Sequence, residues 1–95
     1  MESGQKNTLL IVDDDKANLL MLSNILQPEF NVRVASDGKT AINIAEKHLP
    51  DLILLDILMP GMDGYQVFTE LQKMDNTAHI PVIFITGLNN NNDEK

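Results

Sequence analysis

The sequence contains no cysteine and no tryptophan among its 95 residues, and aromatic residues make up only 4% of it. The absence of cysteine excludes disulfide bonds, thiolate metal sites and cysteine nucleophiles from this chain, and it fits a reducing cytoplasm. Positive charge is also scarce, since 7 Lys and Arg oppose 14 Asp and Glu for a net charge of -7. Direct binding to nucleic acid is therefore not expected, because phosphate contacts need clustered basic side chains.

Long apolar runs are absent as well. No stretch approaches the roughly 20 residues of a membrane span, and residues 1–7 are polar, without the apolar core of a signal peptide. We therefore expect no membrane partner and a cytoplasmic location. The length allows one domain. We expect a disordered segment over residues 1–7, a folded domain over 8–88, and a polar tail or the start of a further helix over 89–95.

Short runs rich in apolar and β-branched residues predict β-strands. Three of these runs are apolar almost throughout, which is typical of strands covered on both faces, while the second alternates apolar with polar residues. The four predicted strands span residues 8–12, 30–34, 52–55 and 80–85.

Between the strands, apolar residues recur at helical spacing, and Asp, Ser and Pro mark the ends of these segments. Asp15 and Asp63 are predicted N-caps, and Gln66 completes a capping pair with Asp63. The alternation of strands and helices predicts an α/β fold, in which a parallel sheet carries helices on both faces in a three-layer sandwich. The apolar helical segments span residues 19–26, 41–49 and 67–74.

Polar side chains follow three of the predicted strands. Asp13, Asp14 and Asp15 end the first, Asp56 ends the third, and Thr86 ends the fourth. In parallel α/β sheets the functional site lies beyond the carboxyl ends of the strands. If these strands are neighbours, four carboxylates and one hydroxyl meet in one pocket.

Such a pocket favours a hard divalent cation, because clustered carboxylates repel one another and Mg²⁺ prefers oxygen ligands. A carboxylate beside Mg²⁺ can also be a nucleophile that forms an aspartyl phosphate. Asp56 is the predicted nucleophile because it stands alone after the central strand. Asp13 and Asp14 are the predicted metal ligands, and Thr86 is placed to bind a phosphoryl oxygen. The plainer alternative is that these residues are caps and turn residues, for which Asp and Thr are also favoured.

Three segments resemble the signature segments of the CheY-like receiver domain of response regulators in two-component signalling. They are Leu-Leu-Ile-Val-Asp-Asp-Asp at residues 9–15, Leu-Leu-Asp-Ile-Leu-Met-Pro-Gly-Met-Asp-Gly at 54–64, and Pro-Val-Ile-Phe-Ile-Thr at 81–86. The resemblance extends from residue 8 to about 88. It implies a flavodoxin-like fold and a signalling domain rather than an enzyme, with at most Mg²⁺-dependent self-phosphorylation and dephosphorylation.

The resemblance also implies roles for single residues. Asp56 would be the phosphoacceptor, and Asp13 and Asp14 the acidic pair that binds Mg²⁺. Leu58 would add its backbone carbonyl to the metal, and Thr86 would carry the activation signal. The implied partner is a sensor histidine kinase or a phosphotransfer domain, which donates the phosphoryl group from a phosphohistidine.

The sequence departs from the family pattern after the fourth strand, where it ends at Lys95 without the fifth strand and its phosphate-binding lysine. The resemblance therefore implies a receiver truncated after that strand. Its open apolar edge predicts a homodimer or an oligomer that exchanges elements. The alternative function is a receiver-like dimerisation or interaction module that is not phosphorylated. A Rossmann nucleotide site is not favoured, because no glycine-rich turn follows the first strand. An aspartate-based phosphatase is not favoured either, because such an enzyme would have a second Asp two residues after the nucleophile, and Leu58 stands there.

Overall fold

The computed structural model describes residues 6–85, which form strands and helices in the predicted alternating order. The strands are β1 (Asn7–Val12), β2 (Phe30–Ala35), β3 (Leu52–Asp56) and β4 (Val82–Ile85). The helices are α1 (Lys16–Leu26), α2 (Gly38–His48) and α3 (Gly64–Gln72). All strand pairs are parallel and the sheet order is β2-β1-β3-β4, so the predicted flavodoxin-like α/β fold is confirmed.

Some predicted boundaries were wrong by one or two residues. β1 begins at Asn7, inside the segment expected to be disordered, because this residue pairs with Phe30 of β2. β4 begins after Pro81, whose ring removes the backbone N–H that a sheet ladder uses. Helix α3 ends before Met74, which lies in the following turn. The expected segments at residues 1–5 and 89–95 lie outside the described residues.

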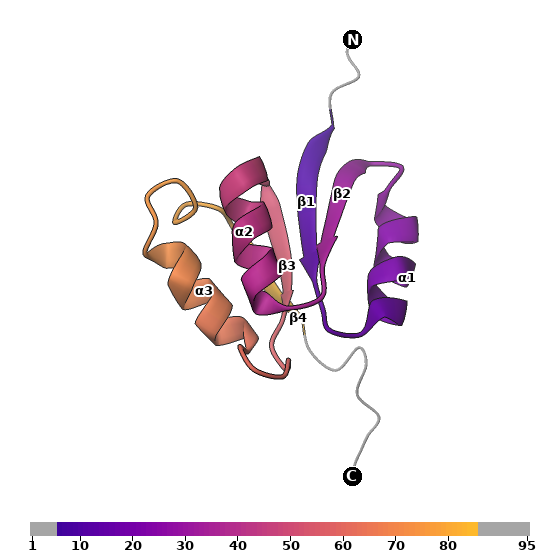
Figure 1. Cartoon of the computed structure of the whole chain (residues 1–95). Coiled ribbons are helices and arrows are strands. Elements are labelled where there is room, and N and C mark those ends of the chain that lie inside the picture. The colour runs from indigo at the N-terminus through magenta and orange to yellow at the C-terminus, as the bar shows by residue number, and fades with distance from the viewer. Residues whose placement is uncertain (1–5, 86–95) are drawn as a thin grey trace.

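The helices divide between the two faces of the sheet, with α1 on one side and α2 and α3 on the other (Figure 1). Alternate side chains of β1 point to opposite faces. Leu9 and Ile11 pack with Leu19 of α1, while Leu10 and Val12 face α2 and α3. All four β1 side chains are at most 1% exposed. This explains the unbroken apolar run and confirms that β1 is covered on both faces.

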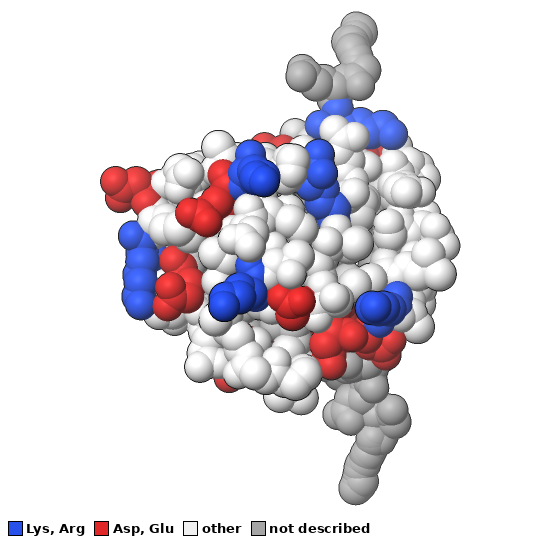
Figure 2. Space-filling view, viewed as in Figure 1, with Lys and Arg blue, Asp and Glu red and all other residues white. Residues whose placement is uncertain are grey.

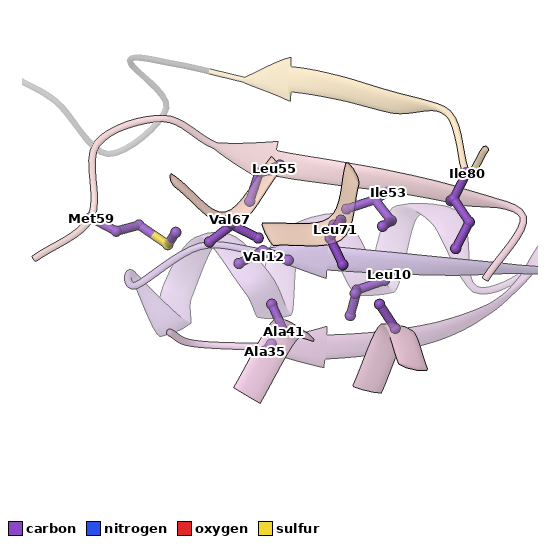
Figure 3. Packing of buried hydrophobic residues seen from close by; sticks show 11 residues of the cluster. Leu10, Val12, Ala35, Ala41, Ile53, Leu55, Met59, Val67, Leu71 and Ile80 are labelled. Carbon is purple, nitrogen blue, oxygen red and sulfur yellow. The ribbon is translucent and has the colours of Figure 1, made fainter. Parts of the chain in front are cut away.

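The larger apolar cluster lies between the sheet and helices α2 and α3 (Figure 3). It draws residues from three strands and from the segment before β4. Its buried members are Leu10, Val12, Ala35, Ala41, Ala45, Ile53, Leu55, Met59, Val67, Leu71 and Ile80.

The expectation that the fourth strand is buried on both faces was wrong within residues 6–85. Ile83 is 50% exposed, although its neighbour Leu54 packs in the α1-side cluster. The reason is position: β4 is the last strand of the described sheet, and α1 contacts β1 and β2 on that face. On the other face, Phe84 meets the rings of Phe68 and Tyr65 of α3, at centroid distances of 5.6 and 5.1 Å.

Each helix begins with an aspartate cap. Asp15 accepts a hydrogen bond from the Ala17 amide, and Asp37 accepts one from the Thr40 amide. Asp63 forms a full capping box at the start of α3, as predicted. Because the strands are parallel and each helix follows a strand, the helix N-termini gather at the carboxyl edge of the sheet. In the part of the chain that the structure describes, no helix has the length and apolar character needed to cross a membrane.

Candidate functional site

The site lies at the carboxyl edge of the two central strands. In the register of β1 with β3, Val12 pairs with Leu55, so Asp13 leaves β1 directly beside Asp56. One carboxylate oxygen from each of Asp13, Asp14 and Asp56 lies within 4.8 Å of the others. The prediction that neighbouring strands bring these three carboxylates together is therefore confirmed. Figure 2 shows acidic atoms gathered at the lower right, around the β1–α1 connection of Figure 1.

Asp13 is completely buried and held by the first turn of α1. Its Oδ1 accepts the backbone N–H of Asp15 at 2.9 Å, and its Oδ2 accepts a long hydrogen bond from Asn18 Nδ2 at 3.4 Å. Its own backbone N–H donates to the carbonyl of Ala35 at the end of β2, at 3.1 Å. These contacts hold the Asp13 carboxylate in one orientation toward β3.

Asp56 is 2% exposed, and its Oδ2 is buried without a hydrogen-bond partner among the described residues. Burial raises the pKa of Asp56 to about 6, and the negative charge of Asp13 adds to this effect, while the Leu58 amide opposes it. A carboxylate oxygen without a partner is costly to bury, and such groups in native structures point to a bound ion or a chemical role. A cation beside Asp56 would satisfy this oxygen.

The loop from β3 to α3 fixes the backbone around Asp56. The N–H of Ile57 donates to the carbonyl of Ile85 in β4, and the N–H of Gly64 donates back to the carbonyl of Ile57. Gly61, in the middle of the loop, has a φ of +80°, a left-handed conformation that glycine adopts without penalty. Leu58 follows Asp56 in this loop with its side chain 59% exposed. Its predicted role, donation of a carbonyl to the metal, remains a prediction.

The structure divides the three adjacent aspartates. Asp13 is buried, Asp14 is more open to solvent, and Asp15 is used to cap α1. The expectation of four clustered carboxylates was therefore wrong, because Asp15 turns away to satisfy a helix amide. Thr86, the predicted hydroxyl, lies outside the described residues. Its neighbour Ile85 pairs with Asp56 across the sheet.

Asn18 is a site residue that the sequence reasoning missed. It is 9% exposed and reaches Asp13 from the first turn of α1. Its position in the sequence could have identified it, because Asn18 is a polar residue four positions before Leu22, on the face of α1 that otherwise packs on the sheet.

A parallel α/β sheet with an acidic cluster at the carboxyl edge, and one of its carboxylates on a central strand, offers oxygen ligands of the kind that a hard cation prefers. Comparison with known families identifies the domain further. The model of the response regulator receiver domain matches residues 9–95, and the chain belongs to this family. Receiver domains are signalling domains rather than enzymes, and they interact with histidine kinases or phosphotransfer partners.

Curated relatives include a probable cyclic di-GMP phosphodiesterase of Vibrio cholerae, 42% identical over 95 residues, covering 100% of this chain and 22% of that protein. The response regulator PleD of Caulobacter vibrioides is 46% identical over 86 residues, covering 90% of this chain and 19% of that protein. The chain thus spans about a fifth of the length of these relatives.

Among solved structures, a putative response regulator from Chloroflexus aurantiacus is 34% identical with a TM-score of 0.82, covering 90% of this chain and 71% of that one. The receiver domain of a sensor histidine kinase from Pseudomonas aeruginosa PAO1 is 28% identical with a TM-score of 0.79, covering 84% and 66%. That structure has a magnesium ion coordinated in its active-site cleft.

Proposed function

We propose that this chain is a phosphoacceptor, in which Asp56 takes a phosphoryl group from the phosphohistidine of a sensor histidine kinase or a phosphotransfer domain. The observation that carries the proposal is the buried Asp56 carboxylate, which lies against Asp13 and Asp14 and whose Oδ2 has no hydrogen-bond partner in the part of the chain that the structure describes. A purely structural aspartate at a strand end would have its buried oxygens satisfied.

These residues fit a magnesium ion. Three carboxylates within 4.8 Å of one another supply hard oxygen ligands, and within residues 6–85 the buried Asp56 Oδ2 has no hydrogen-bond partner. Asp13, Asp14 and Asp56 would hold the ion, with the Leu58 carbonyl as a further ligand. The ion, when bound, would neutralise the carboxylates and the incoming phosphoryl oxygens.

In the proposed transfer, an oxygen of the Asp56 carboxylate forms a bond to phosphorus as the phosphorus–nitrogen bond of the phosphohistidine breaks. The electron pair of that bond stays on the imidazole, which then takes a proton. With a pKa of about 6, Asp56 is mostly ionised at neutral pH and can act as the nucleophile without a separate base. Burial removes water that would compete with the donor. Thr86 would bind a phosphoryl oxygen and carry the signal onward.

The chain would by itself catalyse at most its own phosphorylation from a small donor and its own dephosphorylation. We place its action in the cytoplasm, where kinases find ATP. What the phosphorylation controls depends on the protein to which the domain belongs.

One observation favours a second candidate, an interaction module that works by pairing with another copy. β4 neighbours only β3 in the described sheet, and Ile83 is 50% exposed beside that edge. Unpaired strand edges with apolar side chains favour pairing between chains. We therefore propose that the 95-residue chain forms a homodimer through β4, or an oligomer that exchanges an element. Light scattering across a wide concentration range tests this, and a wild type that stays monomeric throughout would refute it. Ile83→Lys should shift a dimer toward monomer.

The deciding experiment is the intact-protein mass after incubation with Mg²⁺ and acetyl phosphate. We expect a phosphoryl adduct on the wild type and on Asp75→Asn, an exposed control, but not on Asp56→Asn. No adduct on a wild type that circular dichroism shows to be folded would contradict the phosphoacceptor proposal and leave the interaction module in its place.

A further inference from the structure

The side-chain amide of Asn18 contacts the acidic cluster. Its Nδ2 lies 3.4 Å from Asp13 Oδ2, and the residue is buried. Its position is secured by Leu19, the next residue, which packs into the cluster with Leu9 and Ile11 on the α1 side of the sheet. Asn18 therefore approaches Asp13 from a rigid part of the fold.

The two oxygens of the Asp13 carboxylate are held by two different donors. Oδ1 accepts the Asp15 backbone N–H, and Oδ2 accepts the Asn18 amide. The final torsion of an aspartate side chain has a broad, weak preference of its own. One donor alone would leave the carboxylate free to turn about that bond, whereas donors on both oxygens fix its plane. Asn18 carries no charge, so its contribution is to orientation rather than to the net charge of the site.

Orientation matters more for one cation than for another. Mg²⁺ requires near-ideal octahedral geometry with short ligand distances, while Ca²⁺ accepts variable numbers of ligands in flexible arrangements. A carboxylate that is free to turn therefore weakens a Mg²⁺ site more than a Ca²⁺ site. Ligand-orienting groups of this kind typically contribute about 10–100-fold to metal affinity.

We propose that Asn18 is a positioning residue that holds the Asp13 carboxylate in the orientation suited to Mg²⁺, and so gives the site its preference for Mg²⁺ over Ca²⁺. This inference rests on the proposed Mg²⁺ site and adds a determinant of its selectivity. Asn18 itself does not contact the ion in this account.

The test uses Asn18→Leu and Asn18→Ala in the full 95-residue chain. Leu fills the space without a donor, while Ala guards against failure of the larger side chain to fit. Asn24→Leu and Asn24→Ala are matched controls, because Asn24 is exposed on the same helix. The affinities for Mg²⁺ and for Ca²⁺ are each measured by displacement of Mn²⁺, followed by electron paramagnetic resonance. Urea unfolding in EDTA reports the stability of each variant without metal.

We expect both Asn18 variants to bind Mg²⁺ about 10-fold or more weakly than the wild type, with a smaller loss for Ca²⁺, so that the ratio of the two affinities falls. The Asn24 variants should match the wild type. An unchanged Mg²⁺ affinity in a folded Asn18 variant, or an equal loss for both ions, would overturn the inference while leaving the proposed function intact. A wild type that binds no Mg²⁺ would overturn the metal part of the proposed function, and this inference with it.

Discussion

Substitution of Gly64 by alanine should disturb the site from the backbone outward. A Cβ built at Gly64 would overlap the carbonyl oxygen of Asp56 and would lie 2.9 Å from Ile57 Cα and 3.1 Å from the Asp56 carbonyl carbon. All three are backbone atoms, so no flexible side chain can move aside. The start of α3 must then shift away from the end of β3, straining the Gly64-to-Ile57 hydrogen bond of 2.9 Å.

Overpacking of this kind typically destabilises a fold by about 1–3 kcal/mol, and we expect Gly64→Ala to lower the free energy of unfolding in urea by that amount. The shift also reaches the reacting group, since a misplacement of roughly 1 Å can slow a reaction about 100-fold. The rate of phosphoryl uptake from acetyl phosphate, followed by intact mass with Mg²⁺ present, should therefore fall steeply.

Gly61→Ala is the matched control. It lies in the same loop, at a φ of +80°, and a Cβ there meets nothing within 4 Å. Its penalty is the left-handed backbone alone, roughly 1–2 kcal/mol, and Gly61→Asn should recover part of it. We expect Gly61→Ala to lose stability with little change in the rate of uptake. A Gly64→Ala protein with wild-type stability and rate would refute the close-approach argument.

Three further outcomes follow from the geometry. Burial raises the pKa of Asp56 to about 6 from a usual 3.8. The folded state therefore binds the proton more tightly than the unfolded chain does. Above pH 6 the ionised Asp56 lowers the free energy of unfolding by up to about 3 kcal/mol. Asp56→Asn should therefore raise the free energy of unfolding, measured in urea without metal at pH 7, and this gain should disappear as the pH falls below about 4. A gain that persists below pH 4 would contradict the raised pKa of Asp56. Mg²⁺ should raise the melting temperature of the wild type in proportion to the logarithm of its concentration, and a flat response in calorimetry would count against a metal site. Leu49 ends α2 at a φ of 45° and is 49% exposed, so Leu49→Gly should stabilise the fold by about 1 kcal/mol in urea; a loss of stability would mean that the exposed side chain packs favourably.

The parts of the fold that local physics decides were predictable from the sequence. β1 was recognisable because helices cover both of its faces, which demands apolar residues at every position. The helix starts at Asp15 and Asp63 were recognisable because a cap is a contact between residues two or three positions apart. The meeting of Asp13 with Asp56 needed only the rule that parallel strands share a carboxyl edge.

The wrong predictions concern features that depend on distant neighbours. The apolar composition of β4 suggested burial, yet exposure depends on what lies beside a strand, and Ile83 has no helix over it among the described residues. Similarly, Met74 continues the helical apolar spacing, but a turn that places Thr77 Oγ1 2.7 Å from the Leu71 carbonyl ends the helix first.

The separate roles of the three consecutive aspartates could not be predicted from the sequence. Their side chains are chemically identical, and the turn from β1 into α1 makes Asp13 a buried carboxylate, Asp14 a more open one and Asp15 a helix cap. The cap and the ligand are linked, because the Asp15 amide that begins the helix also holds Asp13 Oδ1. The start of α1 and the orientation of the Asp13 carboxylate therefore depend on the same backbone amide. A change that frays the first turn of α1 should weaken cation binding even where it touches no carboxylate.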